Sequence, residues 1–96
     1  MTMKPVVTIS YCPACHWLPR STWMAQELLH TFVDELELVA LRPSSTPGEF
    51  IISVDGEPIW NRKKDGGFPD IQTLKQRVRD RVAPGRDLKH IDRNTS

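Results

Sequence analysis

The sequence predicts one α/β domain in which four strands and two main helices follow in the order β-α-β-β-β-α. Three observations predict this class. The chain has 96 residues, which is the length of a single domain. Short runs of β-branched and aromatic residues alternate with longer segments whose apolar residues recur at helical spacing. The composition, with 39% hydrophobic and 26% charged residues, is ordinary for a soluble globular protein, so a folded core is expected.

The first half of the chain predicts a β-α-β unit. Val6–Tyr11 is an unbroken β-branched and aromatic run, which predicts a strand buried on both faces. Proline is tolerated only in the first turn of a helix, so Pro19 lets the next helix begin no earlier than about residue 15. This helix is expected to extend to about residue 34. Its core-facing stripe comprises Ala25, Leu28, Leu29 and Phe32. Residues 36–41 predict a second strand, parallel to the first, because the helix between them forms a crossover.

A β-hairpin is expected next. After a loop over residues 43–48 comes a predicted strand at Phe50–Val54. The Asp-Gly pair at positions 55–56 is a two-residue turn signal, so residues 57–60 should pair back against this strand. Pro58 cannot donate a ladder hydrogen bond, and the last strand is therefore expected at an edge of the sheet.

The chain then predicts a second main helix and a polar tail. A basic loop over residues 61–69 leads to Asp70, which has the residue type of an N-cap. Pro84 and Gly85 end the helix. Its core-facing residues are Ile71, Leu74, Val78 and Val82. Its charged residues, expected on a solvated face, are Lys75, Arg77, Arg79 and Arg81. Residues 86–96 have too little apolar content to fold alone.

The two cysteines, Cys12 and Cys15, lie where the first strand ends and the helix begins. A disulfide between them would close too short a loop to be a useful structural staple. The thiolate is the reactive form of cysteine, and a helix N-terminus or a protonated His16 would stabilise it. The spacing lets one sulfur attack a disulfide while the other resolves the mixed disulfide. The pair therefore predicts thiol–disulfide redox chemistry.

Three other interpretations of the cysteines fit the sequence less well. Inert packing cysteines would not be expected in a turn that contains Pro13. Zinc needs two further ligands, and His16, His30 and His90 lack the spacing of a zinc site. The letters CPACH match the c-type haem attachment pattern, but such proteins are usually assembled after export. Because residues 1–5 lack a charged region followed by an apolar export segment, the haem interpretation is disfavoured and a cytoplasmic location is expected.

Charge and hydropathy exclude two classes of partner. The net charge is +1, whereas a nucleic-acid binder normally has a basic surplus on one face. No stretch is as long and apolar as a membrane span requires. Neither nucleic acid nor membrane is expected as a partner. Trp17 and Trp23 flank the start of the first helix; they are expected in the core or half-buried, or alternatively as a patch for a partner or a second subunit.

Four stretches carry a resemblance to a known family: VTISYCPAC at residues 7–15, TPGEF at 46–50, DGEPIW at 55–60 and RKKDGGF at 62–68. With these, residues 5–83 resemble the selenoprotein W family of thioredoxin-like proteins, in its bacterial cysteine-containing members. The resemblance implies a thioredoxin-like redox domain over residues 1–85, with sheet order 2-1-3-4, followed by the polar tail. It also implies redox activity towards client thiols or disulfides, with glutathione as a candidate co-substrate and no bound metal or cofactor.

The resemblance leaves the attacking sulfur open. In thioredoxins the first cysteine of the motif attacks the partner disulfide, and this position is Cys12 here. In selenoprotein W the selenocysteine occupies the second position, which is Cys15 here. This chain has cysteine at that position and should react more slowly than selenium-containing members.

The same resemblance implies further site residues. Thr46 and Pro47 match the position of a proline that faces the dithiol in thioredoxin-like proteins, where it is cis; X–Pro bonds in general favour trans. Gly66 and Gly67 are similar to a glycine pair that holds a glutathione carboxylate in glutaredoxins, through free N–H groups at a helix N-terminus. An ordinary flexible loop with an N-cap is the alternative. The residues expected to contact a partner are Pro13, Thr46, Pro47, Gly66 and Gly67. Basic residues next to the glycines are Arg62, Lys63 and Lys64.

A second class of function is also consistent with the sequence. A redox-regulated adaptor would bind a client protein through the exposed dithiol end without turnover. A disulfide turnover assay separates it from an oxidoreductase.

Overall fold

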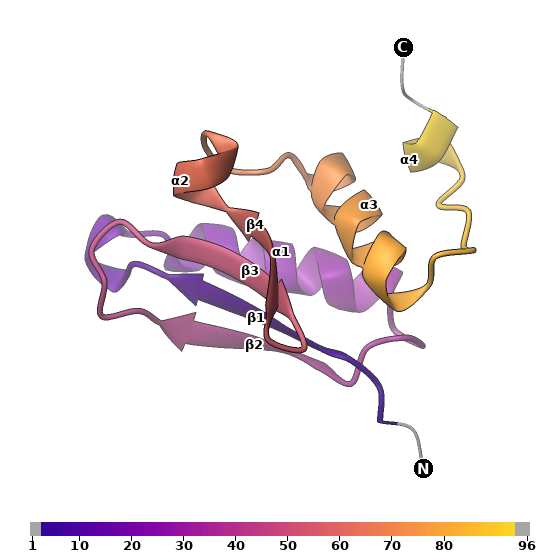
Figure 1. Ribbon diagram of the computed structural model, residues 1–96, viewed down its shortest axis with the longest axis horizontal. Helices are drawn as coiled ribbons and strands as arrows, with labels where there is room; N and C mark the ends of the chain where they lie inside the picture. The colour runs from indigo at the N-terminus through magenta and orange to yellow at the C-terminus, as the bar shows by residue number, and fades with distance from the viewer. Residues whose placement is uncertain (1–2, 94–96) are drawn as a thin grey trace.

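Four strands form one mixed sheet in the order β2-β1-β3-β4, which confirms the predicted order (Figure 1). The computed structural model describes residues 3–93. The strands are β1 (Val6–Tyr11), β2 (Leu38–Pro43), β3 (Phe50–Val54) and β4 (Glu57–Asn61). β1 pairs parallel with β2 and antiparallel with β3, and β3 pairs antiparallel with β4. The second strand begins two residues later than predicted, and Leu36 is instead a buried residue of the preceding turn.

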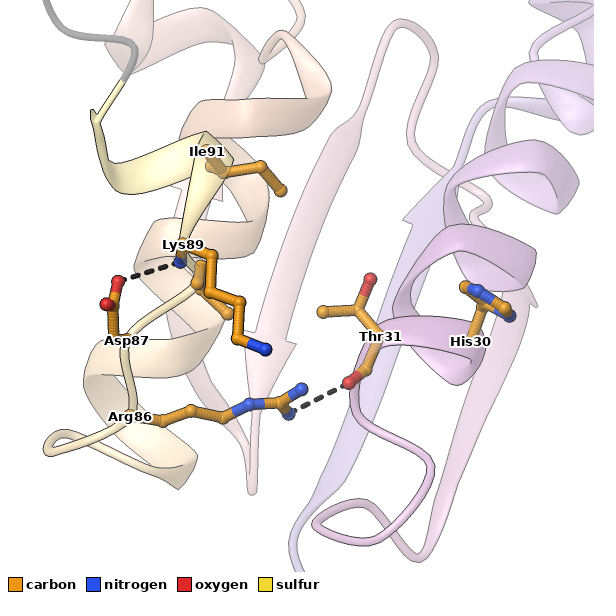
Figure 2. Close-up of a pocket in the computed structure, with 7 residues that line it drawn as sticks. His30, Thr31, Arg86, Asp87, Lys89 and Ile91 are labelled. Carbon is orange, nitrogen blue, oxygen red and sulfur yellow. Dashed lines mark hydrogen bonds between the residues drawn. The ribbon is translucent and has the colours of Figure 1, made fainter.

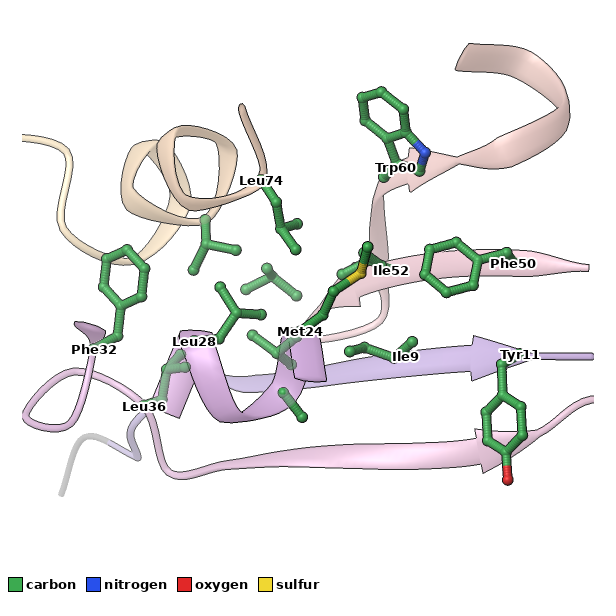
Figure 3. Packing of buried hydrophobic residues seen from close by; sticks show 14 of the residues in the cluster. Ile9, Tyr11, Met24, Leu28, Phe32, Leu36, Phe50, Ile52, Trp60 and Leu74 are labelled. Atoms are coloured by element: carbon green, nitrogen blue, oxygen red, sulfur yellow. The ribbon is translucent and has the colours of Figure 1, made fainter. Parts of the chain in front are cut away.

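Helices cover one face of the sheet (Figures 1 and 3). They are η1 (Pro13–Cys15), α1 (Leu18–Thr31), α2 (Arg62–Asp65), α3 (Ile71–Val82) and α4 (His90–Arg93). The strand β1 alternates between buried and half-buried residues, so the prediction of burial on both faces is wrong. No helix among the described residues is long and apolar enough to cross a membrane.

The core lies between α1, α3 and the covered face of the sheet (Figure 3). Ile9 and Ile52 are paired on neighbouring strands and fully buried, and Leu28 and Leu74 pack over them from the two helices. The predicted stripe of α1 is correct except at Leu29, which is 44% exposed. Met24 and Ser21 take buried positions on α1 instead.

The first helix begins later and ends earlier than the sequence predicts. α1 begins at Leu18 rather than near residue 15, because His16 has a left-handed backbone with φ of 62° and separates η1 from α1. Pro19 still lies in the first turn, as proline requires. The helix ends at Thr31, three residues before the predicted end, and the chain turns there towards Leu36.

The hairpin and the second main helix follow the prediction closely. Asp55 and Gly56 have φ of 49° and 85°, the left-handed values that a tight hairpin requires. Pro58 lies on the edge strand, next to a register irregularity in β3. Asp70 caps α3: its carboxylate accepts the Thr73 N–H at 2.8 Å, which lowers the pKa of Asp70.

Two features in the second half of the chain, one before α3 and one within it, were not predicted. The expected loop contains α2, whose N-cap is Asn61; its side-chain oxygen accepts the N–H groups of Lys63 and Lys64. In α3 the Lys75 side chain is not solvated. It is buried and donates to Glu27 of α1 at 3.0 Å, so this charge joins the two helices.

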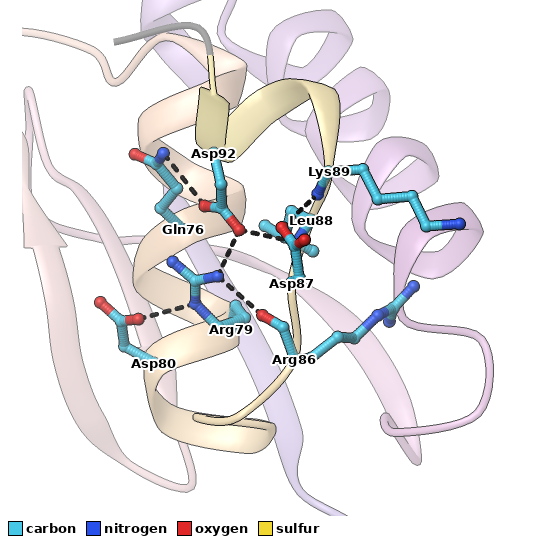
Figure 4. Close-up of polar contacts among 8 residues, drawn as sticks. All are labelled: Gln76, Arg79, Asp80, Arg86, Asp87, Leu88, Lys89 and Asp92. Carbon is cyan, nitrogen blue, oxygen red and sulfur yellow. Dashed lines mark hydrogen bonds and ion pairs between the residues drawn. The ribbon is translucent and has the colours of Figure 1, made fainter.

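The segment after α3 is attached to α3 (Figure 4) and to α1 (Figure 2). Arg79 donates to Asp92 at 2.7 Å, and this bond lowers the pKa of Asp92 to about 2. Asp92 also accepts the Leu88 N–H at 2.6 Å. Arg86 reaches α1, where it donates to the Thr31 carbonyl and pairs with Glu35. These ion pairs and hydrogen bonds therefore attach the polar segment to both main helices.

Candidate functional site

The two cysteines lie at the carboxyl end of β1 and are joined by a disulfide. Their Cα atoms are 5.3 Å apart, and the turn η1 closes between them with the Cys15 N–H donating to the Cys12 carbonyl. We expected the pair at the N-terminus of the long helix. Since α1 begins three residues after Cys15, the turn η1 and not that helix terminus carries the sulfurs.

The two cysteines differ in their access to solvent. Cys12, which directly follows the last residue of β1, is only 2% exposed. Cys15 is partly exposed, and Pro13, Ala14 and His16 around it are exposed. A molecule approaching from solvent therefore meets Cys15 before it meets Cys12.

The loop with Thr46 and Pro47 reaches the same end of the sheet (Figure 1). The Ser44 N–H donates to the carbonyl of Tyr11 at 2.7 Å, and Phe50 at the other end of the loop pairs with Tyr11 in the sheet. Both ends of the loop therefore lie next to the residue that precedes Cys12. The Thr46–Pro47 bond is trans, as are all peptide bonds that the structure describes. Contact between Pro47 and the disulfide stays a prediction.

Gly66 and Gly67 end α2, and their backbone N–H groups are not free. Both donate to the Arg62 carbonyl at 3.0 Å, and the Gly67 carbonyl accepts the indole N–H of Trp60 at 2.9 Å. Their φ values of 79° and 134° lie in the region that favours glycine. The glycines are therefore used to turn the chain, and the free N–H groups that we expected for a carboxylate are occupied here.

An aromatic cluster that the sequence did not indicate lies beside the disulfide. The rings of Trp17, Phe50 and Phe68 pack edge to face, with centroids 4.9 Å apart for Trp17–Phe68 and for Phe50–Phe68. Arg20 and Arg62 stack on this cluster, with Cζ 4.1 Å from the Phe68 centroid and 4.8 Å from the Trp17 centroid, respectively. No motif predicts such a cluster, because its members come from three separate segments. Trp17 thus packs inward, while Trp23 is 47% exposed.

A cavity of about 500 Å³ lies away from the disulfide, at the far end of α1 (Figure 2). His30 and Thr31 line it from α1, and Arg86, Lys89 and Ile91 line it from the C-terminal segment. The 14 residues of α1 separate it from Trp17 by roughly 20 Å of helix. Among the described residues, no group of three His, Cys, Asp or Glu side chains could hold a metal ion.

The chain is similar to one protein family and to several solved structures. The model of the Rdx family matches residues 6–80. A selenoprotein W-related protein from Vibrio cholerae is 52% identical, with a TM-score of 0.80 over 83% of this chain and 99% of that one. A structure from Bordetella parapertussis is also 52% identical, with a TM-score of 0.80 over 83% of this chain and all of that one. None of the curated proteins compared with the chain matches it.

Proposed function

Since this chain belongs to the Rdx family and has the thioredoxin-like fold of its selenoprotein W-related neighbours, we propose that it is a cytoplasmic thiol–disulfide oxidoreductase. Its partners are client proteins whose thiols or disulfides exchange with the Cys12–Cys15 pair, and glutathione is the proposed co-substrate. One observation carries the proposal: the chain holds a disulfide with one buried and one accessible sulfur.

The difference in exposure supports Cys15 as the sulfur that meets the partner. In the reduced protein, the Cys15 thiolate attacks a client disulfide, forms a mixed disulfide and releases one client thiolate. The Cys12 thiolate then attacks the Cys15 sulfur, re-forms the internal disulfide and releases the second client thiolate. The client disulfide is thereby reduced by two electrons, the protein is oxidised to its disulfide, and water protonates the released thiolates.

Thr46, Pro47 and Pro13 are proposed to border the bound partner. The anchoring of the loop beside Tyr11 supports this assignment. Gly66 and Gly67 are proposed to contribute through the shape of the turn rather than through their N–H groups.

Trapping in cells tests the order of attack. The Cys12→Ser variant keeps the accessible thiol and cannot resolve, so it should accumulate mixed disulfides with clients. The Cys15→Ser variant keeps only the buried thiol and should trap little, and the double variant is the blank. More trapping by Cys15→Ser than by Cys12→Ser would contradict the assignment. A chain that binds clients in every variant and shows no turnover with glutathione and a disulfide substrate would instead be an adaptor.

A further inference from the structure

We propose that Arg20 and Arg62 form a carboxylate-binding site beside the disulfide, so that the protein selects disulfide partners that carry carboxylates. This inference rests on the proposed function, because it names the chemical class of partner that the Cys12–Cys15 pair meets. It starts from two guanidinium groups that are held in place by aromatic rings and not by acidic side chains.

Both guanidinium groups lie near the Phe68 ring. The Arg20 Cζ is 4.1 Å from the Phe68 centroid, and the Arg62 Cζ is 4.8 Å from the Trp17 centroid. Arg62 is also 5.7 Å from the Phe68 centroid, so both cations lie close to one ring. A guanidinium has five N–H donors, and a cation–π contact with a ring leaves most of them available for a ligand. The contacts with the rings therefore hold both cations in place without using up their donors.

The other arginines that join elements of the fold are used differently. Arg79 donates to Asp92 and Asp80, Arg86 pairs with Glu35, and Arg81 pairs with Glu57. Among the described residues, no carboxylate or carbonyl accepts a hydrogen bond from Arg20 or Arg62. Two cations without an acid between them create a positive potential, and planar guanidinium groups match the geometry of a carboxylate.

The connectivity of the chain places this pair next to the sulfurs. Trp17 is two residues from Cys15, so their Cα atoms are at most about 7.6 Å apart. Phe50 contacts both rings of the cluster and pairs in the sheet with Tyr11, which precedes Cys12. A carboxylate bound by Arg20 or Arg62 would therefore hold a partner whose sulfur lies within reach of the accessible Cys15.

Three small disulfides of different charge test the inference on the reduced full-length protein. The probes are the dianion 5,5′-dithiobis(2-nitrobenzoate), the neutral 4,4′-dithiodipyridine and the dication cystamine. The second-order rate constant is measured for each probe. The neutral probe reports any change in the thiolate itself, so the ratio of the anionic to the neutral rate constant isolates recognition of the carboxylate.

The double variant Arg20→Gln/Arg62→Gln should lower this ratio roughly ten-fold, since an exposed charge pair changes a rate by about two- to five-fold. The ratio of the cationic to the neutral rate constant should rise. Lys4→Gln is the control for net charge, because Lys4 is exposed and precedes the opposite end of β1; it should change neither ratio. Arg20→Lys/Arg62→Lys keeps the charge but loses the planar fork, and should give an intermediate ratio.

Two peptide disulfides, identical except for Glu or Gln beside the cysteine, distinguish protein partners from low-mass partners as the source of the carboxylate. A preference for the Glu peptide that needs both arginines extends the site to protein partners; a preference seen only with the small dianion assigns it to low-mass partners. If neither preference depends on Arg20 and Arg62 while the wild type reacts with the probes, this inference is overturned and the proposed function stands. If the wild type reacts with no disulfide, both are refuted.

Discussion

Replacing Trp60 by Phe should loosen the segment that supports the aromatic cluster. The Trp60 side chain is 8% exposed, and its indole N–H donates to the Gly67 carbonyl at 2.9 Å. The Arg77 guanidinium also lies 4.5 Å above its ring. Gly67 directly precedes Phe68, the ring on which Arg20 stacks. Phenylalanine keeps a buried ring at this site but has no N–H to hold Gly67.

The magnitude follows from three losses. The missing hydrogen bond costs about 1 kcal/mol, because Gly67 is only half-buried and water can replace part of the bond. The smaller ring removes roughly 40 Å² of buried apolar surface, which is worth about 1 kcal/mol. A weaker contact with Arg77 adds roughly 0.5 kcal/mol. The free energy of unfolding should therefore fall by about 2 to 3 kcal/mol. This loss corresponds to a Tm that is lower by about 10 to 20 °C.

Urea denaturation of both proteins measures this difference, with Trp23→Phe as the matched control. Trp23 is 47% exposed on α1, so the same substitution there should change the free energy of unfolding by less than about 0.5 kcal/mol. Equal effects at Trp60 and Trp23 would refute the assignment of the indole as the support of Gly67. The variant should also lower the preference for anionic disulfides, because Phe68 loses its fixed neighbour.

Three further predictions test the fold. Asp70→Ala removes the N-cap of α3 and should lower the free energy of unfolding by about 1 kcal/mol in urea denaturation. Leu28→Ala removes a fully buried side chain and should cost about 3 kcal/mol in the same assay, whereas Leu29→Ala, at 44% exposure, should cost less than about 1 kcal/mol. Folding lowers the pKa of Asp92 from 3.8 to about 2, so its stabilisation is complete above 3.8 and is lost as the pH falls through 2. The Leu88 amide donates to Asp92, so its protection against hydrogen exchange, relative to the intrinsic rate at each pH, should fall across that interval.

Each of these three predictions would be contradicted by a specific result. An Asp70→Ala variant as stable as the wild type would mean that other groups satisfy the first turn of α3. Equal losses at Leu28 and Leu29 would contradict the assignment of the buried face of α1. The Asp92→Asn variant cannot ionise, so its Leu88 amide should exchange quickly at neutral pH and show no step in acid; a step that persists would assign it to another carboxylate.

The elements of the fold were predictable wherever a local rule decides the backbone. The strands β1 and β3, the Asp-Gly turn at residues 55–56 and the Asp70 cap all express local preferences of the sequence, whereas the alternating burial of β1 depends on which face the helices cover and was not predicted. The start of α1 was mispredicted because Pro19 sets only a limit on where a helix begins. The left-handed residue His16 decides the actual boundary, and histidine carries no strong preference that would indicate it.

Long-range ion pairs account for what the sequence could not predict in the second half. The periodicity of α3 identifies Leu74 and Val78 as core residues, but Lys75 has no apolar pattern that predicts its burial. It is buried because Glu27, on a different helix, lies within 3.0 Å. The attachment of the C-terminal segment depends in the same way on Asp92 meeting Arg79. Sequence spacing cannot identify such partners, since tertiary packing alone brings them together.

At the candidate site, a sequence motif predicts some of the features and tertiary packing decides the others. The CxxC spacing located the disulfide, but it could not predict that Cys12 is buried and Cys15 accessible, because the exposure of each sulfur depends on how the chain packs around the turn η1. The glycine pair predicted an anion-binding site at the end of α2, but both of its N–H groups donate to the Arg62 carbonyl. With those backbone donors occupied, positive charge for an anionic partner has to come from side chains. The aromatic cluster supplies it by holding Arg20 and Arg62, which form no ion pair within residues 3–93 that the structure describes.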